Sequence, residues 1–411
     1  MDLAASLVST LNHVETPFII VKIGNYTFGH CDKSYKDTMT NTFKITYPNY
    51  MDSLTVTKVN GAINTYVVNM TYAITQHDDP NLLDKVFSSV SNTRKIVLTY
   101  GDWNAPGFIY KNEEAVITKV TTKVNMQSSS ITYVINCTST SIALRSGSFN
   151  FPAKVDKPSS VLIGLLNNES YGLKTIFKGM NNIKDYGQFI ATDDKAVQLE
   201  ARASISVIDY IGYLVGCMVN KNDTSDKLKK YCYFWAVYDD IDNTYGGTYF
   251  KVKHVEANKP IKSYNTYEVD VGYPTPECVI DFSVNNDDSW TLLYNYADKM
   301  HLPKYAYSID DEGNIVTEDS EMVTTSSNYL KTTEAQRNWW SLVTQFPITA
   351  TLTMKGLLRP AMLMSYVKVN VYFYGRKHIT SGTYLITKQT DTISNQGYRT
   401  TLSLTRVAQD V

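Results

Sequence analysis

The sequence lacks the features that would assign a function at once. Its formal net charge is only −1 over 411 residues, so no overall field would draw the protein to nucleic acid or to an anionic membrane. The motifs G-x-x-x-x-G-K-[ST], G-x-G-x-x-G, H-E-x-x-H and G-x-S-x-G do not occur. Sequence grounds for nucleotide binding, zinc-dependent proteolysis or serine hydrolase chemistry are therefore missing.

Cysteine is scarce, with five widely scattered residues and no C-x-x-C pair. A disulfide scaffold would be denser, and a structural zinc site would need clustered ligands. We therefore expect free thiols and a reducing compartment at the time of folding. The first 17 residues lack the basic region and the long apolar core of a signal peptide.

Long apolar runs are also missing, and the longest apolar stretch, 204–220, contains interruptions. It is shorter than the roughly 20 residues that span a bilayer. Its apolar residues recur with helical spacing, and Ser206 with Asp209 has the pattern of a capping box. The stretch predicts a core helix and no membrane segment.

Tyrosine is abundant, with 31 residues against 14 Phe and 5 Trp. Tyrosine and threonine favour half-buried strands, and tyrosine is common where proteins meet. Apolar and polar residues alternate over segments that predict strands: 18–24, 54–59, 65–74, 94–100, 113–124, 130–137, 231–240, 246–256, 277–296 and 346–411. Helices are predicted over 78–90, from 160 onward and over 204–220.

The fold class predicted is mainly β (α+β), with a duplicated β domain, because three blocks recur in the same order. The hairpin 56–72 is similar to 280–296, "KIVLTYG" (95–101) to "VNVYFYG" (369–375), and "VITKVT" (116–121) to "LITKQT" (385–390). After the third block, the apolar residues Ile131, Tyr133 and Ile135 match Thr400, Leu402 and Leu404. This match keeps the core-facing phase.

The predicted domains are 1–150, a first β domain; 151–265, a mixed helical/β middle domain; 266–300 with 345–411, the second β domain; and 301–344, a loop-rich insertion in that second copy. When each chain carries two copies of a domain, a ring of n chains contains 2n similar units. Such a ring joins components of different rotational symmetry.

The chain resembles the central baseplate hub proteins of contractile-tailed bacteriophages and related injection systems. The resemblance rests on "VNGAINTYVVNMTYAI" (59–74), "RKIVLTYGD" (94–102), "AVITKV" (115–120), "SSITYVINCTS" (129–139) and the segment 346–407. It implies that the two duplicated domains are tube-like β-barrel domains, and that the chain is a homotrimer in which these two domains per chain form a pseudo-hexameric ring. It also implies a place in the virion, in the tail baseplate assembled in the host cytoplasm.

The partners implied by this resemblance are a tail tube or tube-adaptor protein on one face and a central spike protein on the other. Tape-measure protein and DNA would pass through the lumen without specific binding. No cofactor or metal is implied, and the function is structural rather than enzymatic.

Two groups of residues are candidate sites. Lys119 and Lys123 share a strand face, and Lys388 matches Lys119 across the repeat. They are either lumen-facing residues or ordinary solvated lysines. Trp339 and Trp340 are candidate anchors of a domain or subunit contact.

Residue patterns that could indicate calcium binding or catalysis also occur, but each has a simpler explanation. The acidic stretch 238–247 lacks the glycine and the final glutamate of a calcium loop. The adjacent carboxylates Asp310, Asp311 and Glu312 precede a glycine, which is typical of a turn, and His30 and Cys31 point to opposite faces of a strand. A receptor- or carbohydrate-binding tail protein remains the alternative function, and a cell-wall hydrolase lacks a separated carboxylate pair or a zinc triad.

Overall fold

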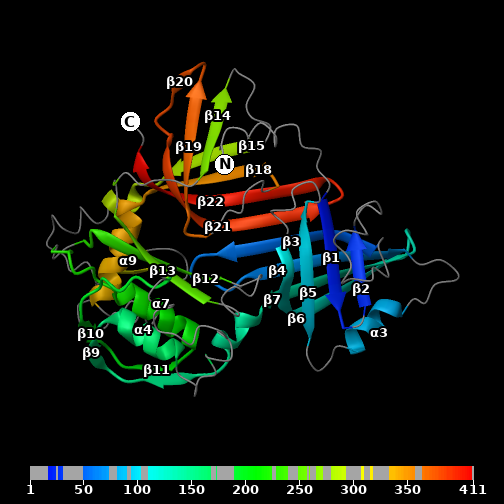
Figure 1. Ribbon diagram of the computed structural model, residues 1–411, viewed down its shortest axis with the longest axis horizontal. Coiled ribbons are helices and arrows are strands. Elements are labelled where there is room, and N and C mark those ends of the chain that lie inside the picture. Colours follow the sequence, from blue (N-terminus) through cyan, green and yellow to red (C-terminus); the bar gives the residue numbers. More distant parts are fainter. Residues whose placement is uncertain are drawn as a thin grey trace.

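The computed structural model describes residues 17–24, 26–30, 50–73, 81–89, 94–102, 110–167, 173, 189–224, 228–238, 249–256, 259, 265–271, 279–292, 307–309, 315–317, 333–356 and 363–409. Strands dominate, as the sequence predicts, and most of them belong to one large sheet (Figure 1).

The strands of this sheet are β1 (Pro17–Ile23), β2 (Tyr26–His30), β3 (Met51–Val59), β4 (Thr65–Ala73), β5 (Lys95–Asp102), β6 (Tyr110–Asn125), β7 (Ser130–Ser139), β14 (Asn265–Val271), β15 (Val279–Asn286), β18 (Ile348–Lys355), β19 (Tyr366–Phe373), β20 (Arg376–Lys377), β21 (Gly382–Ser394) and β22 (Gly397–Gln409). The smaller strand pairs are β8 (Phe149–Phe151) with β11 (Arg202–Ile205), β9 (Lys154–Asp156) with β10 (Val197–Leu199), β12 (Tyr231–Tyr238) with β13 (Tyr249–Glu256), and β16 (Tyr307–Ile309) with β17 (Ile315–Thr317). The helices are α3 (Leu82–Ser89), η4 (Thr140–Arg145), α4 (Pro158–Leu166), α7 (Val207–Cys217) and α9 (Thr333–Gln345).

The large sheet runs in the order β15-β18-β22-β21-β3-β4-β7-β6-β5-β1-β2, with β14, β19 and β20 branching from β21. Strands β21 and β22, near the C-terminus, therefore lie beside β3 and β4 from the N-terminal part (Figure 1). At the two ends, β5, β1 and β2 on one side and β14 and β19 on the other cross the direction of the central strands (Figure 1). The β21–β3 pairing joins the two ends of the chain into one sheet.

The strand order of one half of the sheet repeats in the other. One run is β3-β4-β7-β6-β5 and the other is β15-β18-β22-β21-β19, with antiparallel neighbours throughout. The next strand differs, because β1 is antiparallel to β5 whereas β14 is parallel to β19. The two runs thus share five strands in the same arrangement.

Bulges occur at matching places in the two runs. The β6–β7 register shifts between Ile117 and Lys119, and the β21–β22 register shifts between Ile386 and Lys388. The β3–β4 and β15–β18 pairs each shift directly after their first pair as well. A bulge is a specific local feature, so the shared positions fix how one run superposes on the other.

This superposition corrects the predicted match after "LITKQT". The β6–β7 turn leaves 126–129 outside the pairing, but the β21–β22 turn leaves only 395–396. The second strand is therefore displaced by two residues, so that Ile135 corresponds to Leu402. Because side chains alternate with period two, this displacement leaves the same residues facing the core.

The Tyr-Gly match in the sequence is wrong. Tyr100 is fully buried in β5, whereas Tyr374 lies in a turn with φ 50° and is 74 % exposed. The Tyr-Gly match predicts Asn370 as the counterpart of Ile96. The pairing register instead makes Val367 its counterpart, three residues earlier in the sequence. Displacing the match by an odd number of residues exchanges the two faces of the strand, so the identical Tyr-Gly residues occupy different environments in the two runs.

The predicted second strand of the 280–296 hairpin is also wrong, because residues 289–292 are helical and β15 pairs instead with β18. The predicted loop-rich segment ends earlier than expected, because α9 begins at Thr333. Most residues of α9 are polar, so the sequence shows no continuous apolar face there. The other predicted strands and the three predicted helices are confirmed where the structure describes them.

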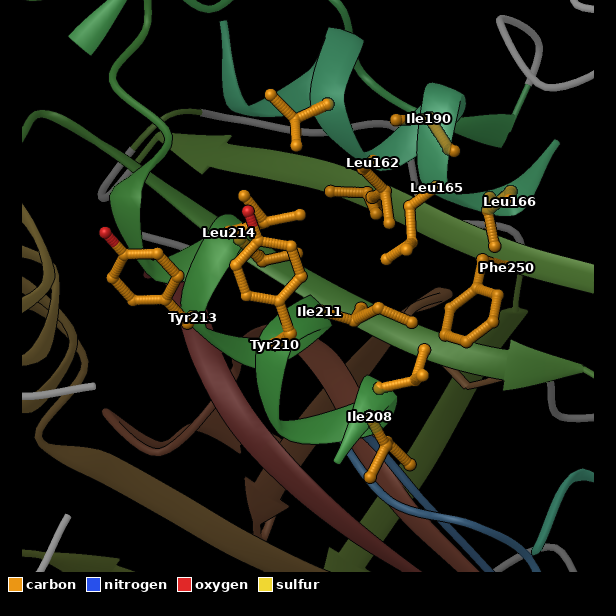
Figure 2. Packing of buried hydrophobic residues seen from close by; sticks show 14 of the residues in the cluster. Leu162, Leu165, Leu166, Ile190, Ile208, Tyr210, Ile211, Tyr213, Leu214 and Phe250 are labelled. Carbon is orange, nitrogen blue, oxygen red and sulfur yellow. The ribbon is translucent and has the colours of Figure 1, made fainter. Parts of the chain in front are cut away.

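The middle of the chain packs two helices against a hairpin. Leu162 and Leu165 of α4 lie against Ile211 and Leu214 of α7, beside Phe250 of β13 (Figure 2). The Ser206 hydroxyl oxygen accepts from the Asp209 amide at 3.2 Å, so the predicted N-cap of α7 is confirmed.

A buried lysine connects α7 to α9. Lys229 is 0 % exposed, and its Nζ donates to the carbonyls of Gly216 (2.9 Å) and Met218 (3.0 Å) at the end of α7. Glu334 of α9 lies 3.8 Å away. Burial lowers the pKa of Lys229 to about 8, and the Glu334 charge opposes that shift.

A half-buried lysine holds the middle hairpin to the start of β19. Lys253 donates to the Met364 carbonyl, and its Nζ lies 3.7 Å from the centre of the Tyr366 ring. Burial lowers its pKa to about 7.

The Lys253 environment predicts a pH-dependent stability. The unfolded chain binds this proton up to about pH 10.5, and the folded chain only up to about pH 7. The free energy of unfolding therefore rises with pH between 7 and 10 in the native protein relative to Lys253→Met, by on the order of 1 kcal/mol or more. Urea denaturation at several pH values measures this difference. Lys259→Met removes an exposed lysine that pairs with Glu256 at 2.7 Å, and should show no such rise; a flat difference for Lys253→Met would contradict the prediction.

Candidate functional site

One face of the central strands carries short polar side chains across both runs. We call it the polar face and define it by these residues: Ser53, Thr55, Thr57, Thr65, Asn69, Thr71, Lys119, Thr121, Lys123, Asn125, Ser130, Thr132, Asn136, Thr138, Asp281, Ser283, Asn285, Thr349, Thr351, Thr353, Lys355, Lys388, Thr390, Thr392, Ser394, Arg399, Thr401, Ser403 and Thr405. Nearly all are partly or largely exposed. The alternate residues of the same strands form the buried core.

Side-chain hydrogen bonds link neighbouring strands across the polar face. Asn69 Nδ2 donates to Ser53 Oγ at 2.8 Å, and the Thr71 and Thr132 hydroxyls are 3.2 Å apart. The other run has a similar contact between the hydroxyls of Thr353 and Thr401, at 3.3 Å. Such pairs stabilise a sheet surface without apolar contacts.

The bulge threonines make the same contact in both runs. Thr118 Oγ1 donates to the Asn136 carbonyl at 3.0 Å, and Thr387 Oγ1 donates to the Ser403 carbonyl at 3.1 Å. Asn136 and Ser403 occupy corresponding positions on β7 and β22. The repeated I-T-K triplet therefore repeats a local structure, and not only a composition.

The structure brings the three predicted lysines onto the polar face. Lys119 and Lys388 each follow a bulge directly, and Lys123 lies further along β6. All three are exposed. The other charged residues of the polar face are Lys355, Arg399 and Asp281. Five of its six charges are positive, but whether the face lines a lumen stays a prediction.

The core behind the polar face is shared between the two ends of the chain. Ile393 of β21 and Tyr398 of β22 are 1 % and 2 % exposed, and they belong to the core formed by β1 to β7. Ile393 lies opposite Leu54, which is 0 % exposed. The first run is therefore completed by residues from the second.

A buried acid lies inside this shared core. Both oxygens of the Glu113 carboxylate are used: Tyr66 donates to one at 2.6 Å and Tyr100 to the other at 2.7 Å. Lys58, from the strand that pairs with β21, places its Nζ 3.1 Å from the same carboxylate. Buried charges persist in proteins when they are paired and hydrogen-bonded in this way.

A second buried acid lies on β21. Asp391 is 0 % exposed and accepts from Thr400 Oγ1 and Gln389 Nε2, both at 2.6 Å. Burial raises its pKa, while those hydrogen bonds and the Lys58 charge oppose the rise. No pattern in the sequence identified Glu113 or Asp391, because each lies in a strand whose neighbours alternate normally.

The tryptophans pack within the chain. Trp340 is 5 % exposed, and Trp339 is partly exposed. Trp339 lies edge-on to Trp290, at 5.0 Å between ring centres, and 4.9 Å from Trp340. They fix α9 beside residues 289–292, and a role at a subunit contact stays a prediction.

Among the residues that the structure describes, no group of three or more His, Cys, Asp or Glu side chains is placed to hold a metal ion. Burial raises the pKa of Cys137 and Cys232 to about 12, so neither supplies a thiolate at neutral pH. Residues 239–247 of the calcium-like stretch 238–247, the three adjacent carboxylates and Cys31 lie outside the described residues.

No helix in the described part of the chain has the length and apolar character needed to cross a bilayer.

Comparison with solved structures identifies the fold. The 43 kDa tail protein of prophage MuSo2 from Shewanella oneidensis superposes with a TM-score of 0.50 at 11 % identity, over 97 % of this chain and 100 % of that one. The fold is that of a phage tail protein. The resemblance seen in the sequence is thereby confirmed at the level of a phage tail fold.

Two further tail-related structures are similar over most of this phage tail fold. A tail protein from Neisseria meningitidis has a TM-score of 0.48 at 8 % identity, covering 95 % of this chain and 96 % of that one. A component of the Escherichia coli type VI secretion system has a TM-score of 0.43 at 9 % identity, covering 87 % and 74 %. No protein-family model and no curated protein sequence matches the chain.

Proposed function

We propose that the chain is a non-enzymatic subunit of a phage baseplate hub. Its two five-strand runs form duplicated tube-like domains, and three chains assemble into a pseudo-hexameric ring. The ring joins the tail tube, or its adaptor, to the central spike in the virion.

The observation that carries this proposal is the repeated strand order with matching bulges. Two similar units in one chain supply the factor of two that relates a threefold spike to a sixfold tube. The phage tail fold, matched over the whole chain, supports the same assignment.

The polar face is assigned to the inner wall of the ring. Short Ser, Thr and Asn side chains predominate on this face, with Val59, Val67 and Val134 among them, and a mainly hydrated surface suits passage of tape-measure protein and DNA without specific binding. The positive charges among them would attract an anionic polymer weakly and in a salt-dependent way.

Native mass spectrometry with the tube and spike proteins of the same phage tests the hub function. We expect a trimer that binds both, and electron microscopy of the complex should show a ring with pseudo-sixfold features. A chain that stays monomeric in the presence of both partners would contradict the proposal.

Neutralising Lys388 tests the assignment of the inner wall. The variant Lys388→Gln is expected to form the same ring, because Lys388 is exposed and exposed charges contribute little to stability. DNA ejection from virions carrying it should change its dependence on ionic strength. Loss of the ring, or ejection identical to the native virion at every salt concentration, would argue against this lysine facing the channel.

A further inference from the structure

Among the strands that the structure describes, the pairing between the two runs inside one chain leaves a matching pair of strand edges unused. The second half of β21 pairs on one side with β22 and on the other with β3, over residues 388–394 and 53–59. When the two runs are superposed on their bulges, residues 119–125 of β6 correspond to residues 388–394 of β21. Residues 281–287 then correspond to residues 53–59 of β3. Among the described strands, none pairs with the outer edge of 119–125 or with the outer edge of β15.

Burial differs sharply between the used and the unused edges. In the used pair, Ile393 and Leu54 are 1 % and 0 % exposed. At the matching positions, Val124 is 67 % exposed and Phe282 is partly exposed. An apolar residue at this position of the repeat is therefore covered in one run and open in the other.

The unused edges have complementary charge. The β6 segment 119–125 contains Lys119 and Lys123 and no acidic residue. The segment 281–287 contains Asp281 and Asp287 and no basic residue. Opposite charges on two edges favour their pairing with each other and oppose pairing of either edge with itself.

We propose that β15 of a second copy of this chain pairs antiparallel with the outer edge of β6, in the register that β3 and β21 use within the chain. The proposal rests on the ring described above and specifies how its subunits join. The predicted partners are Lys119 with Asp287, Thr121 with Asn285, Lys123 with Ser283, and Asn125 with Asp281.

This pairing is head-to-tail, because each chain offers a different edge on its two sides. A head-to-tail contact closes into a ring when its rotation allows, and leaves no free edge there. It also continues the polar face from one chain to the next, because polar-face residues of the two edges would lie opposite one another.

Cysteine cross-linking tests the register in the full-length chain with Cys31→Ser and Cys278→Ser. The variant Lys123→Cys/Ser283→Cys places its thiols on directly opposed residues, within the Cα separation that a disulfide spans. The matched control Lys123→Cys/Asn285→Cys shifts one thiol by two residues on the same face, to a diagonal separation of about 7–8 Å. The variant Thr55→Cys/Thr392→Cys calibrates oxidation, since this pair is opposed within one chain.

After mild oxidation, we expect covalent multimers from Lys123→Cys/Ser283→Cys at about fivefold or more the yield of the shifted control, while the calibrating pair closes within single chains. Equal yields, or multimers mainly from the shifted control, would overturn the register. Native mass spectrometry of the unoxidised chain with its partners distinguishes a failure of the proposed strand pairing from a failure of the proposed hub function. A ring with the wrong cross-links overturns only this inference, whereas the absence of a ring overturns the hub function as well.

Discussion

Replacing Ile393 with alanine is expected to lower the free energy of unfolding by about 2–5 kcal/mol. Ile393 is 1 % exposed and packs in the core of the first run, although it belongs to the second-last strand of the chain. Removing its side chain leaves a cavity where the two ends of the chain meet. Urea denaturation of the isolated chain, followed by tyrosine fluorescence and circular dichroism, measures the loss.

Val124→Ala is the matched control, because Val124 occupies the corresponding position of β6. It is 67 % exposed in the single chain, so its replacement should change the stability of the monomer by no more than about 0.5 kcal/mol. Similar effects of the two substitutions would show that the β21–β3 contact is not part of a cooperative core.

Replacing Glu113 with alanine is expected to cost about 3–5 kcal/mol. The carboxylate is the acceptor for the Tyr66 and Tyr100 hydroxyls and for Lys58. Its removal leaves two buried donors and an ammonium group without that acceptor, and the penalty of an unpaired buried group exceeds the value of the bonds it made. The same denaturation experiment measures this loss.

Two controls separate this effect from a general loss of charge. Glu114→Ala removes the neighbouring acid, which pairs with Lys95 at the surface where both side chains are 48 % exposed, and should cost at most about 1 kcal/mol. Glu113→Gln keeps an acceptor oxygen and should fall between the two. If Glu113→Ala were as mild as Glu114→Ala, the buried cluster would not contribute to stability.

Alternating residues predicted strands such as β4, β7 and β18 well, because buried residues alternate there with more exposed ones. The sequence matched Ile135 to Leu404, whereas the structure makes Leu402 its counterpart. This error did not affect the predicted burial, since a displacement by two residues keeps the same side chains on each face of the strand. The Tyr-Gly match failed because it compared residue identities and did not consider which face of the strand each residue occupies. It equated a buried strand residue, Tyr100, with an exposed turn residue, Tyr374.

Contacts that depend on distant pairing were not predictable in this way. Nothing in residues 53–59 or 388–394 alone indicates that they are neighbours, because many alternating strands would pair equally well. The lysine candidates could be placed on one face from the strand period, whereas the Glu113 cluster needed the three-dimensional arrangement of four strands. Helix α9 was missed because its burial comes from packing on α7 and on Trp290, and its own sequence is mostly polar.

The shared core also constrains the order of events during synthesis. The N-terminal run lacks Ile393 and Tyr398 until β21 and β22 have been synthesised, so a nascent chain without them holds an incomplete sheet with β3 unpaired on one side. Its folding must wait for contacts of long sequence separation, which form slowly. In the proposed ring, a chain that stops before β21 would therefore bring an incomplete first run to its neighbour.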